Sequence, residues 1–282
     1  MADHYFAVTG SGSGTGADAD NPQTFSSINL NAVEGAASSG DTIYFLDGRY
    51  EVTFTQLFDN RTSTSITYKS LNFQGATFYK TLNSGDNLQE AYIWASSGFG
   101  HTVQDFVFEN VKLWHNGGLN KLLNCKIFTT TDLLSGARGI IRGGSTNTFT
   151  IHDCSFHYKS AEGNTMLTNL QSGADIQRCT FGFDLSAHTS SVATATGLDN
   201  AATLKNCIIS ADASTYISGS ILEFSDTAVN CCINNMGAVN DQGGGTGDGT
   251  NNVFADPQFV DLSNGDLRLR PSSPCIGAGT AS

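Results

Sequence analysis

Five short segments, each containing a cysteine, repeat through the middle of the chain. They are LLNCKIF (122–128), IHDCSFH (151–157), IQRCTFG (176–182), LKNCIIS (204–210) and VNCCINN (229–235), and they place in one column Cys125, Cys154, Cys179, Cys207 and Cys232, spaced 25 to 29 residues apart. Looser copies, FENVKLW (108–114) and FQGATFY (73–79), place Val111 and Ala76 in that column. A period of this length with one structural unit per repeat indicates a solenoid of stacked coils.

The residue before the cysteine predicts how each coil turns. It is Asn124, Asp153, Arg178 or Asn206, and the apolar residues on its two sides do not keep the alternation of a single strand. Asn and Asp tolerate the left-handed backbone conformation, which resets the side chains that point inward. We therefore predict a tight bend there between two short strands, with coils stacked about 4.8 Å apart.

The cysteines themselves are interpreted as an inert ladder inside the coils. Free cysteine is among the most often buried residue types, and its small apolar side chain packs well in a narrow column. Metal binding requires clustered ligands, whereas only Cys231 and Cys232 are adjacent. With seven cysteines and no visible secretory signal, we expect no disulfides.

The two ends of the chain carry different signals. The stretch FAVTGSGSGTGADAD (6–20) lacks the spacing and the lysine of a phosphate-binding loop, so it is interpreted as a turn-forming loop. Thr24 is expected to cap a short amphipathic helix over 24–36, and the segment 41–52 is expected to form a strand that is apolar on both faces. Such a helix would cover the open end of a solenoid.

Composition and charge exclude several classes of function. Only 14% of residues are charged while 31 are glycine, which is typical of strands and turns with a Ser/Thr/Asn surface. The formal net charge of −12 and the scattered Lys and Arg residues leave no basic stripe for nucleic acid. No apolar run reaches the ~20 residues needed to cross a membrane, and the first residues lack a secretory signal, so we expect synthesis in a cytosol.

Both ends of the chain resemble a known family. The front, HYFAVTGSGSG with NPQTFSSINLNAVEGAASSGDTIYFLDGRY, and the end, DPQFVDLSNGDLRLRPSSPCIGAGT (256–280), are similar to right-handed parallel β-helix proteins of the pectate-lyase-like superfamily. The resemblance implies an all-β fold, a single-stranded right-handed parallel β-helix, with a short N-terminal capping helix and an irregular C-terminal cap. It also implies one domain over 1–282, in which 1–40 form the strand, Gly loop and capping helix, 41–240 the coils, and 241–282 the C-terminal capping segment.

One stretch departs from the repeat. The distance from Val111 to Cys125 is too short for a full coil. Either residues 106–114 belong to a different face of a coil, or an abbreviated coil lies there.

Candidate sites are few. The lyases of this family hold Ca²⁺ with clustered aspartates, and no such cluster is visible here, so no catalytic residue and no metal ligand is assigned and no cofactor is expected. Scattered side chains that a scaffold could bring together are Glu162, Asp175, Asp184, Asp199, Asp212, Glu223, Arg138, Arg142 and Lys159. The stretch DQGGGTGDGTNN (241–252) is interpreted as a surface loop, with Ca²⁺ binding as the alternative. Trp94 and Trp114 are candidates for stacking on sugar rings, with burial under a loop as the alternative.

Function is then inferred from context. The chain resembles bacteriophage virion β-helix proteins, and the first hypothesis is a structural virion component, a tail spike, tail fibre or capsid decoration, made in the host cytoplasm without a signal peptide. Its expected partners are other virion proteins and a host-surface polysaccharide, and a homotrimer is expected; nucleic acid and membrane insertion are not. The alternative is a polysaccharide lyase or glycoside hydrolase, secreted by a bacterium with its signal peptide removed.

Overall fold

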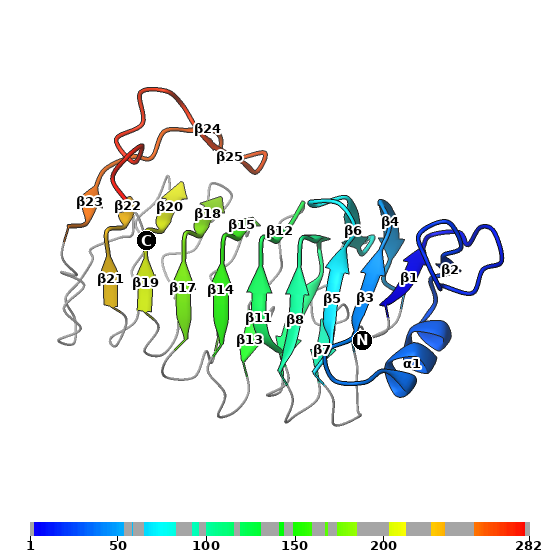
Figure 1. Ribbon diagram of the computed structural model, residues 1–282. Helices are drawn as coiled ribbons and strands as arrows, with labels where there is room; N and C mark the ends of the chain where they lie inside the picture. The colour runs from blue at the N-terminus through cyan, green and yellow to red at the C-terminus, as the bar shows by residue number, and fades with distance from the viewer. Residues whose placement is uncertain are drawn as a thin grey trace.

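The structure is a computed structural model that describes residues 3–53, 58, 65–82, 92–95, 100–115, 119–130, 141–143, 149–159, 167–168, 174–184, 203–212, 227–234 and 251–279. Short parallel strands dominate these residues and stack along one axis (Figure 1). The only helical segment among them, α1 (Ser27–Ala36), lies at the N-terminal end of the stack (Figure 1).

Three parallel sheets run along the stack within the described residues. The first, sheet A, contains in spatial order β2 (Gln23–Thr24), β1 (Asp3–Ala7), β3 (Thr42–Phe45), β5 (Thr67–Ser70), β8 (His101–Gln104), β11 (Leu119–Leu123), β14 (Thr150–His152), β17 (Asp175–Gln177), β19 (Thr203–Lys205) and β21 (Thr227–Val229). Sheet B contains β23 (Val253–Phe254), β22 (Cys232–Asn234), β20 (Ile208–Asp212), β18 (Thr180–Asp184), β15 (Ser155–Lys159), β12 (Lys126–Phe128), β9 (Val107–Glu109), β6 (Ala76–Tyr79) and β4 (Gly48–Glu51). Sheet C contains β16 (Leu167–Thr168), β13 (Ile141–Gly143), β10 (Lys112–His115) and β7 (Tyr92–Ala95).

Each coil contributes successive strands to these sheets, and each strand pairs in parallel with its counterparts in the neighbouring coils. This arrangement confirms the fold class predicted from the sequence, a right-handed parallel β-helix. The strand β23 adds to sheet B although it lies in the range 241–282 that was predicted as a cap. No helix in the described ranges has the length and apolar character required to cross a bilayer.

The bend between sheets A and B has the predicted backbone. In six successive coils a residue with positive φ separates the two strands, and its values lie between 53° and 65° at Asp105, Asn124, Asp153, Arg178, Asn206 and Asn230. The left-handed conformation at this position is the reason that the alternation of apolar residues breaks there.

The residue after the bend forms the expected buried column, with two corrections. Cys125, Cys154, Cys179 and Cys207 are buried and lack disulfides, as predicted. The fifth member is Cys231 and not Cys232, because Asn230 makes the bend and Cys232 already belongs to β22, where it pairs with Ile208. The second correction concerns Val111. Strand β9 pairs with β6 and with β12, and this register places Phe106, not Val111, in the column between Ala76 and Cys125.

The two explanations for the short spacing both hold in part. The coil between Phe106 and Cys125 is abbreviated, and β10, which begins within 106–114 and ends at His115, belongs to a different face, sheet C. Within the ladder the Cys154 Sγ accepts a hydrogen bond from the Cys125 amide at 3.4 Å, and burial raises the pKa of the Cys154 thiol.

The N-terminal end is closed by aromatic packing and by α1. The helix buries Leu30 and Glu34, and Ser26 caps it by accepting a hydrogen bond from the Asn29 amide at 3.1 Å. The predicted cap, Thr24, lies instead in β2, where its hydroxyl accepts a bond from the Gly10 amide at 2.8 Å. The Gly loop is thus tied back to the strand that follows it, as expected for a turn and not for a phosphate site.

Candidate functional site

The C-terminal segment, defined here as residues 255–279, folds back over the outer face of sheet B. Its strands β24 (Phe259–Asp261) and β25 (Asp266–Leu269) form an antiparallel pair, the tail hairpin, which lies above the sheet in Figure 1. At Gly182 sheet B has no side chain on its outer face, so the hairpin can pack directly against the strand. A Cβ added to Gly182 would lie 2.5 Å from Leu267 Cδ2 and 2.7 Å from Leu262 Cδ1, so the two leucines use the space of the missing side chain.

A disulfide joins Cys232 of β22 to Cys275 of the C-terminal segment. The expectation that the chain forms no disulfide is therefore wrong. Because neighbouring residues of a strand point to opposite faces, Cys232 points outward while Cys231 points into the core. The outward position places the Cys232 sulfur under the segment that returns over the sheet.

Polar side chains shape the turn of the tail hairpin. The Asp261 carboxylate accepts hydrogen bonds from Ser263 Oγ at 2.7 Å and from Asn264 Nδ2 at 2.7 Å, and these bonds lower the pKa of Asp261. Gly265 follows with φ +74°. Beyond the turn, Arg268 donates to both oxygens of Asp266, at 2.8 and 2.6 Å, which lowers the pKa of Asp266 to about 2.

His157 lies on the outer face of β15, directly beneath this turn. Its side chain is buried, and neither ring nitrogen has a hydrogen bond of good geometry among the described residues. A Cβ on Gly265 would lie 3.0 Å from its Nδ1, so the turn rests on the imidazole. In the same face, Lys159 Nζ lies 3.3 Å from the buried Asp184 carboxylate.

Burial lowers the pKa of His157 below its ordinary value of 6.5, opposed by the Asp184 carboxylate and a contact with the Leu262 backbone and assisted by Lys159 and Lys126. The unfolded chain therefore binds the proton more tightly than the folded chain. The stability contributed by the neutral imidazole is complete above pH 6.5 and is lost as the pH falls from there through the folded pKa. We predict that His157→Leu reduces the loss of unfolding free energy between pH 6.5 and 4.5, measured by urea denaturation. Equal pH dependence in the two proteins would contradict this prediction.

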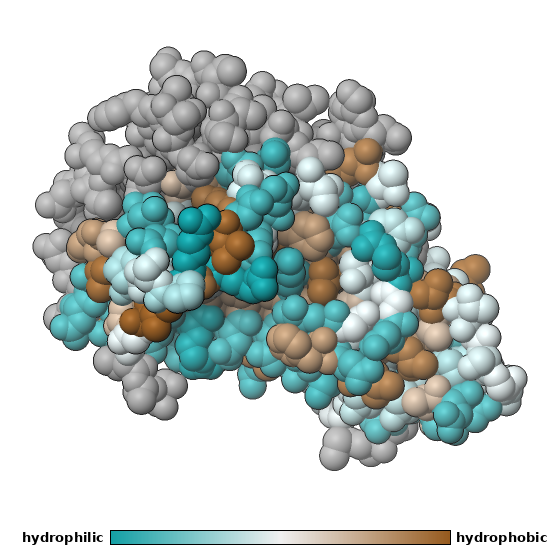
Figure 2. All heavy atoms as spheres, turned by 90° about the horizontal axis from the view of Figure 1, so that it is seen from above, coloured by the Kyte–Doolittle hydropathy of each residue, from teal (hydrophilic) through white to brown (hydrophobic). Residues whose placement is uncertain are grey.

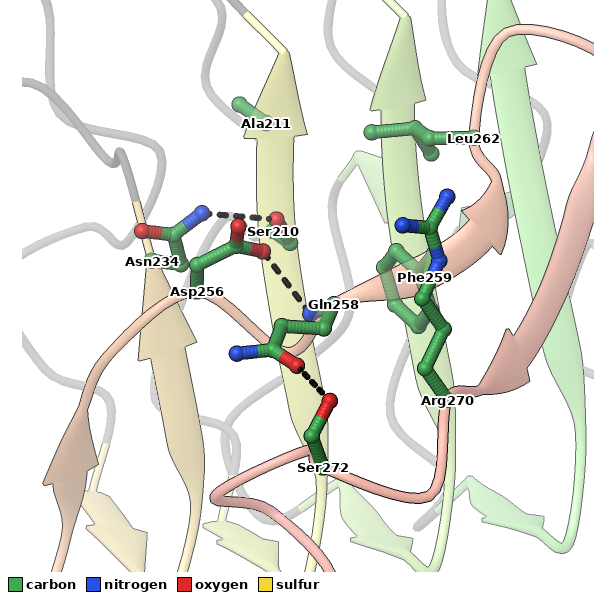
Figure 3. A pocket seen from close by; sticks show the side chains of 9 residues that line it. All are labelled: Ser210, Ala211, Asn234, Asp256, Gln258, Phe259, Leu262, Arg270 and Ser272. Carbon is green, nitrogen blue, oxygen red and sulfur yellow. Dashed lines mark hydrogen bonds between the residues drawn. The ribbon is translucent and has the colours of Figure 1, made fainter.

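A cavity of about 520 Å³, the tail pocket, lies between the C-terminal segment and sheet B (Figure 3). Its lining combines three residues of the β-helix with six of the C-terminal segment: Ser210, Ala211, Asn234, Asp256, Gln258, Phe259, Leu262, Arg270 and Ser272. In Figure 3 the Asp256 carboxylate and the Arg270 guanidinium stand on opposite sides of Gln258.

Hydrogen bonds hold the polar lining in place. Asn234 Nδ2 donates to Ser210 Oγ at 3.2 Å and so connects two neighbouring coils. Ser272 Oγ donates to the side-chain Oε1 of Gln258 at 2.6 Å, and the backbone N–H of Gln258 donates to Asp256 Oδ1 at 2.8 Å.

The lining offers amides, hydroxyls, one carboxylate and one guanidinium around the ring of Phe259, which is 8% exposed. Directional polar groups beside an apolar ring suit a ligand with many hydroxyl groups and a weakly apolar face.

A second cavity of about 480 Å³ lies on the other side of the tail hairpin. It is lined by Lys126, Ser155, Thr180, Asn264, Gly265, Asp266, Leu267 and Arg268. The described surface seen from above is mainly hydrophilic, and its apolar residues are scattered in small groups (Figure 2). Residues of the C-terminal segment thus line both cavities.

The residues singled out from the sequence lie elsewhere. Trp94 and Trp114 are register partners on neighbouring strands of sheet C, but their side chains lie outside what the structure describes. Of the scattered charged residues, Asp184 pairs with Lys159, and Asp175 accepts a hydrogen bond from Gln177 and lies 3.1 Å from His152 Nε2. Asp212 and Arg142 are described only as strand positions, and outside the described residues are Glu162, Asp199, Glu223 and Arg138.

No three His, Cys, Asp or Glu side chains in the described ranges are placed to share a metal ion. Residues 241–250 of the glycine-rich stretch, including Asp248, lie outside those ranges. The tail pocket itself was missed because DPQF and the residues after it were interpreted only as a closing segment. Cys275, which lies in that segment and outside the repeated cysteine column, was the sequence signal from which a link to sheet B could have been predicted.

Comparisons with known proteins extend no further than the fold. No protein-family model matches the sequence, and no curated protein matches it. A solved structure of pectate lyase Pel9A is similar over 100% of this chain and 92% of its own, at 15% identity and a TM-score of 0.49. A rhamnogalacturonan lyase is similar over 84% of this chain and 75% of its own, at 15% identity and a TM-score of 0.43.

Proposed function

We propose that the protein binds a carbohydrate in the tail pocket, as a surface component of a bacteriophage particle. The observation that carries the carbohydrate part is the lining of that pocket. Asp256, Gln258, Asn234 and Arg270 supply both donors and acceptors, and Phe259 supplies an apolar surface. Sugars are recognised by this combination of directional hydrogen bonds and contact with an aromatic ring.

The scaffold supports the same proposal. One wall of the tail pocket, formed by Ser210, Ala211 and Asn234, belongs to sheet B, in which each coil is hydrogen bonded to the next. This wall is preorganised, so it loses little conformational entropy when the pocket binds a ligand. Trp94 and Trp114, one coil apart in sheet C, stay candidates for a second contact with a long glycan.

The test is titration calorimetry with a panel of neutral and acidic oligosaccharides. Gln258→Ala and Arg270→Ala are each expected to weaken binding of the responding glycan about tenfold, because a hydrogen bond to a ligand contributes on the order of 1–2 kcal/mol. The control is Gln177→Ala on the outer face of sheet A, which is expected to leave the affinity unchanged. Binding that is unaffected by both pocket variants, or no binding across the panel, would overturn the carbohydrate proposal.

The same panel separates binding from catalysis. Release of reducing ends or unsaturated uronates that disappears in Asp256→Asn would identify a hydrolase or lyase instead. Peptide mapping of purified phage particles from the source tests the virion setting, and the absence of this chain from such particles would reject it.

A further inference from the structure

We propose that the Cys232–Cys275 disulfide is a redox latch, and that the C-terminal segment is the lid it holds over the outer face of sheet B. The effect of this lid on carbohydrate binding rests on the function proposed above. The opening and closing of the lid do not.

The lid builds most of the tail pocket. Six of the nine lining residues belong to the C-terminal segment, and only Ser210, Ala211 and Asn234 belong to the β-helix. If the segment leaves the sheet, the remaining three residues form part of a flat strand surface. The pocket therefore exists only while the lid is docked.

The docked lid is attached weakly apart from the disulfide. Among the described residues, β24 and β25 pair with each other and with no strand of sheet B. From residue 256 onward, the backbone-to-backbone hydrogen bonds described all stay within the segment, as in Arg270 to Gln258 at 3.0 Å and Gly265 to Leu262 at 3.0 Å. A two-stranded hairpin is at best marginally stable on its own in water. Side-chain packing docks it: Leu262 and Leu267 pack on Gly182, and the turn at Gly265 rests on His157.

The docked state also contains an unfavourable element. His157 is 3% exposed, and its ring nitrogens lack good hydrogen bonds beneath the hairpin turn. An unsatisfied buried polar group destabilises the docked state, and this cost is recovered when the lid opens and water reaches the ring. The disulfide opposes this tendency because it closes a separation of 43 residues and so removes open conformations of the lid.

The positions of the cysteines suit a latch. Cys232 and Cys275 are 2% and 8% exposed, so a reductant reaches the bond when the lid opens transiently. The adjacent Cys231 is a free thiol on the opposite face of the strand, so it is separated from the disulfide by the backbone. Reduction of the latch by a dithiol transfers two electrons and two protons to the disulfide. It yields two protein thiols and converts the dithiol into a cyclic disulfide.

The experiment compares hydrogen exchange in the oxidised protein, in the same protein treated with dithiothreitol, and in Cys275→Ser. We expect amides of 259–269 to exchange at least tenfold faster after reduction and in the variant, while those of β14 and β17 in sheet A stay protected. Alkylation and mass spectrometry should find Cys232 and Cys275 newly modified in the reduced protein, with the column cysteines still protected. Dithiothreitol should cause no further change in Cys275→Ser, which controls for other effects of the reductant.

Unchanged exchange in 259–269 after complete reduction of the bond would overturn the latch. If Cys275→Ser fails to fold, reduction of the folded wild-type protein still gives the answer. A lid that opens while no glycan binds in either state rejects only the carbohydrate proposal. A glycan that binds equally to the oxidised and reduced proteins rejects the latch as a control of the pocket.

Discussion

Replacing Phe45 by alanine is expected to lower the free energy of unfolding by about 3–5 kcal/mol. Phe45 is fully buried in β3, at the centre of the aromatic cluster that closes the N-terminal end of the stack. Its ring lies 5.2 to 5.9 Å, centroid to centroid, from six other rings: Phe6, Phe25, Tyr50, Phe58, Phe78 and Phe106. Neighbouring strands are hydrogen bonded on both sides, so they cannot collapse into the cavity that alanine would leave.

The matched control is Phe73→Ala, because the Phe73 side chain is 70% exposed. Its loss is expected to change the unfolding free energy by about 0.5 kcal/mol or less. Urea denaturation followed by circular dichroism measures both variants. Equal effects of the two substitutions would show that the aromatic cluster does not stabilise the end of the stack.

The main features of the fold could be predicted because successive coils require the same residue types at the same positions. A bend in the left-handed conformation and a small buried residue after it recur in five successive coils, at Cys125, Cys154, Cys179, Cys207 and Cys231. Pairs such as Asn124–Cys125 and Asp153–Cys154 carry this pattern in the sequence. The pattern fails where two residues satisfy it equally well. At Cys231 and Cys232 the spacing does not distinguish them, and only the asparagine directly before Cys231 does.

The candidate site could not be predicted in the same way. Its contacts join residues that no repeat relates, such as Cys232 with Cys275 and Gly182 with Leu267. Gly182 occupies a position where the neighbouring coils have His157 and Ser210. A glycine in a strand signals the close approach of another segment, but it does not say which segment approaches.

Introducing a side chain at Gly182 is expected to displace the tail hairpin. In Gly182→Val the new Cβ would overlap Leu267 and Leu262, whose side chains would lie 2.5 and 2.7 Å from it. The strand β18 is hydrogen bonded to β15 and β20, whereas the hairpin makes no backbone ladder with the described strands of sheet B. The weaker partner moves, so the overlap is relieved by undocking of the hairpin and not by distortion of the sheet.

Gly182→Val should therefore reproduce the effect of opening the lid while the disulfide stays intact. Amides of 259–269 are expected to exchange at least tenfold faster, and the free energy of unfolding of the β-helix should change by less than the ~1–3 kcal/mol typical of overpacking in a closed core. The control is Thr203→Val on the outer face of sheet A, where a similar side chain already fits. Faster exchange in β15 and β20 with a protected hairpin would mean that the sheet yields first, and that the C-terminal segment is a fixed part of the β-helix.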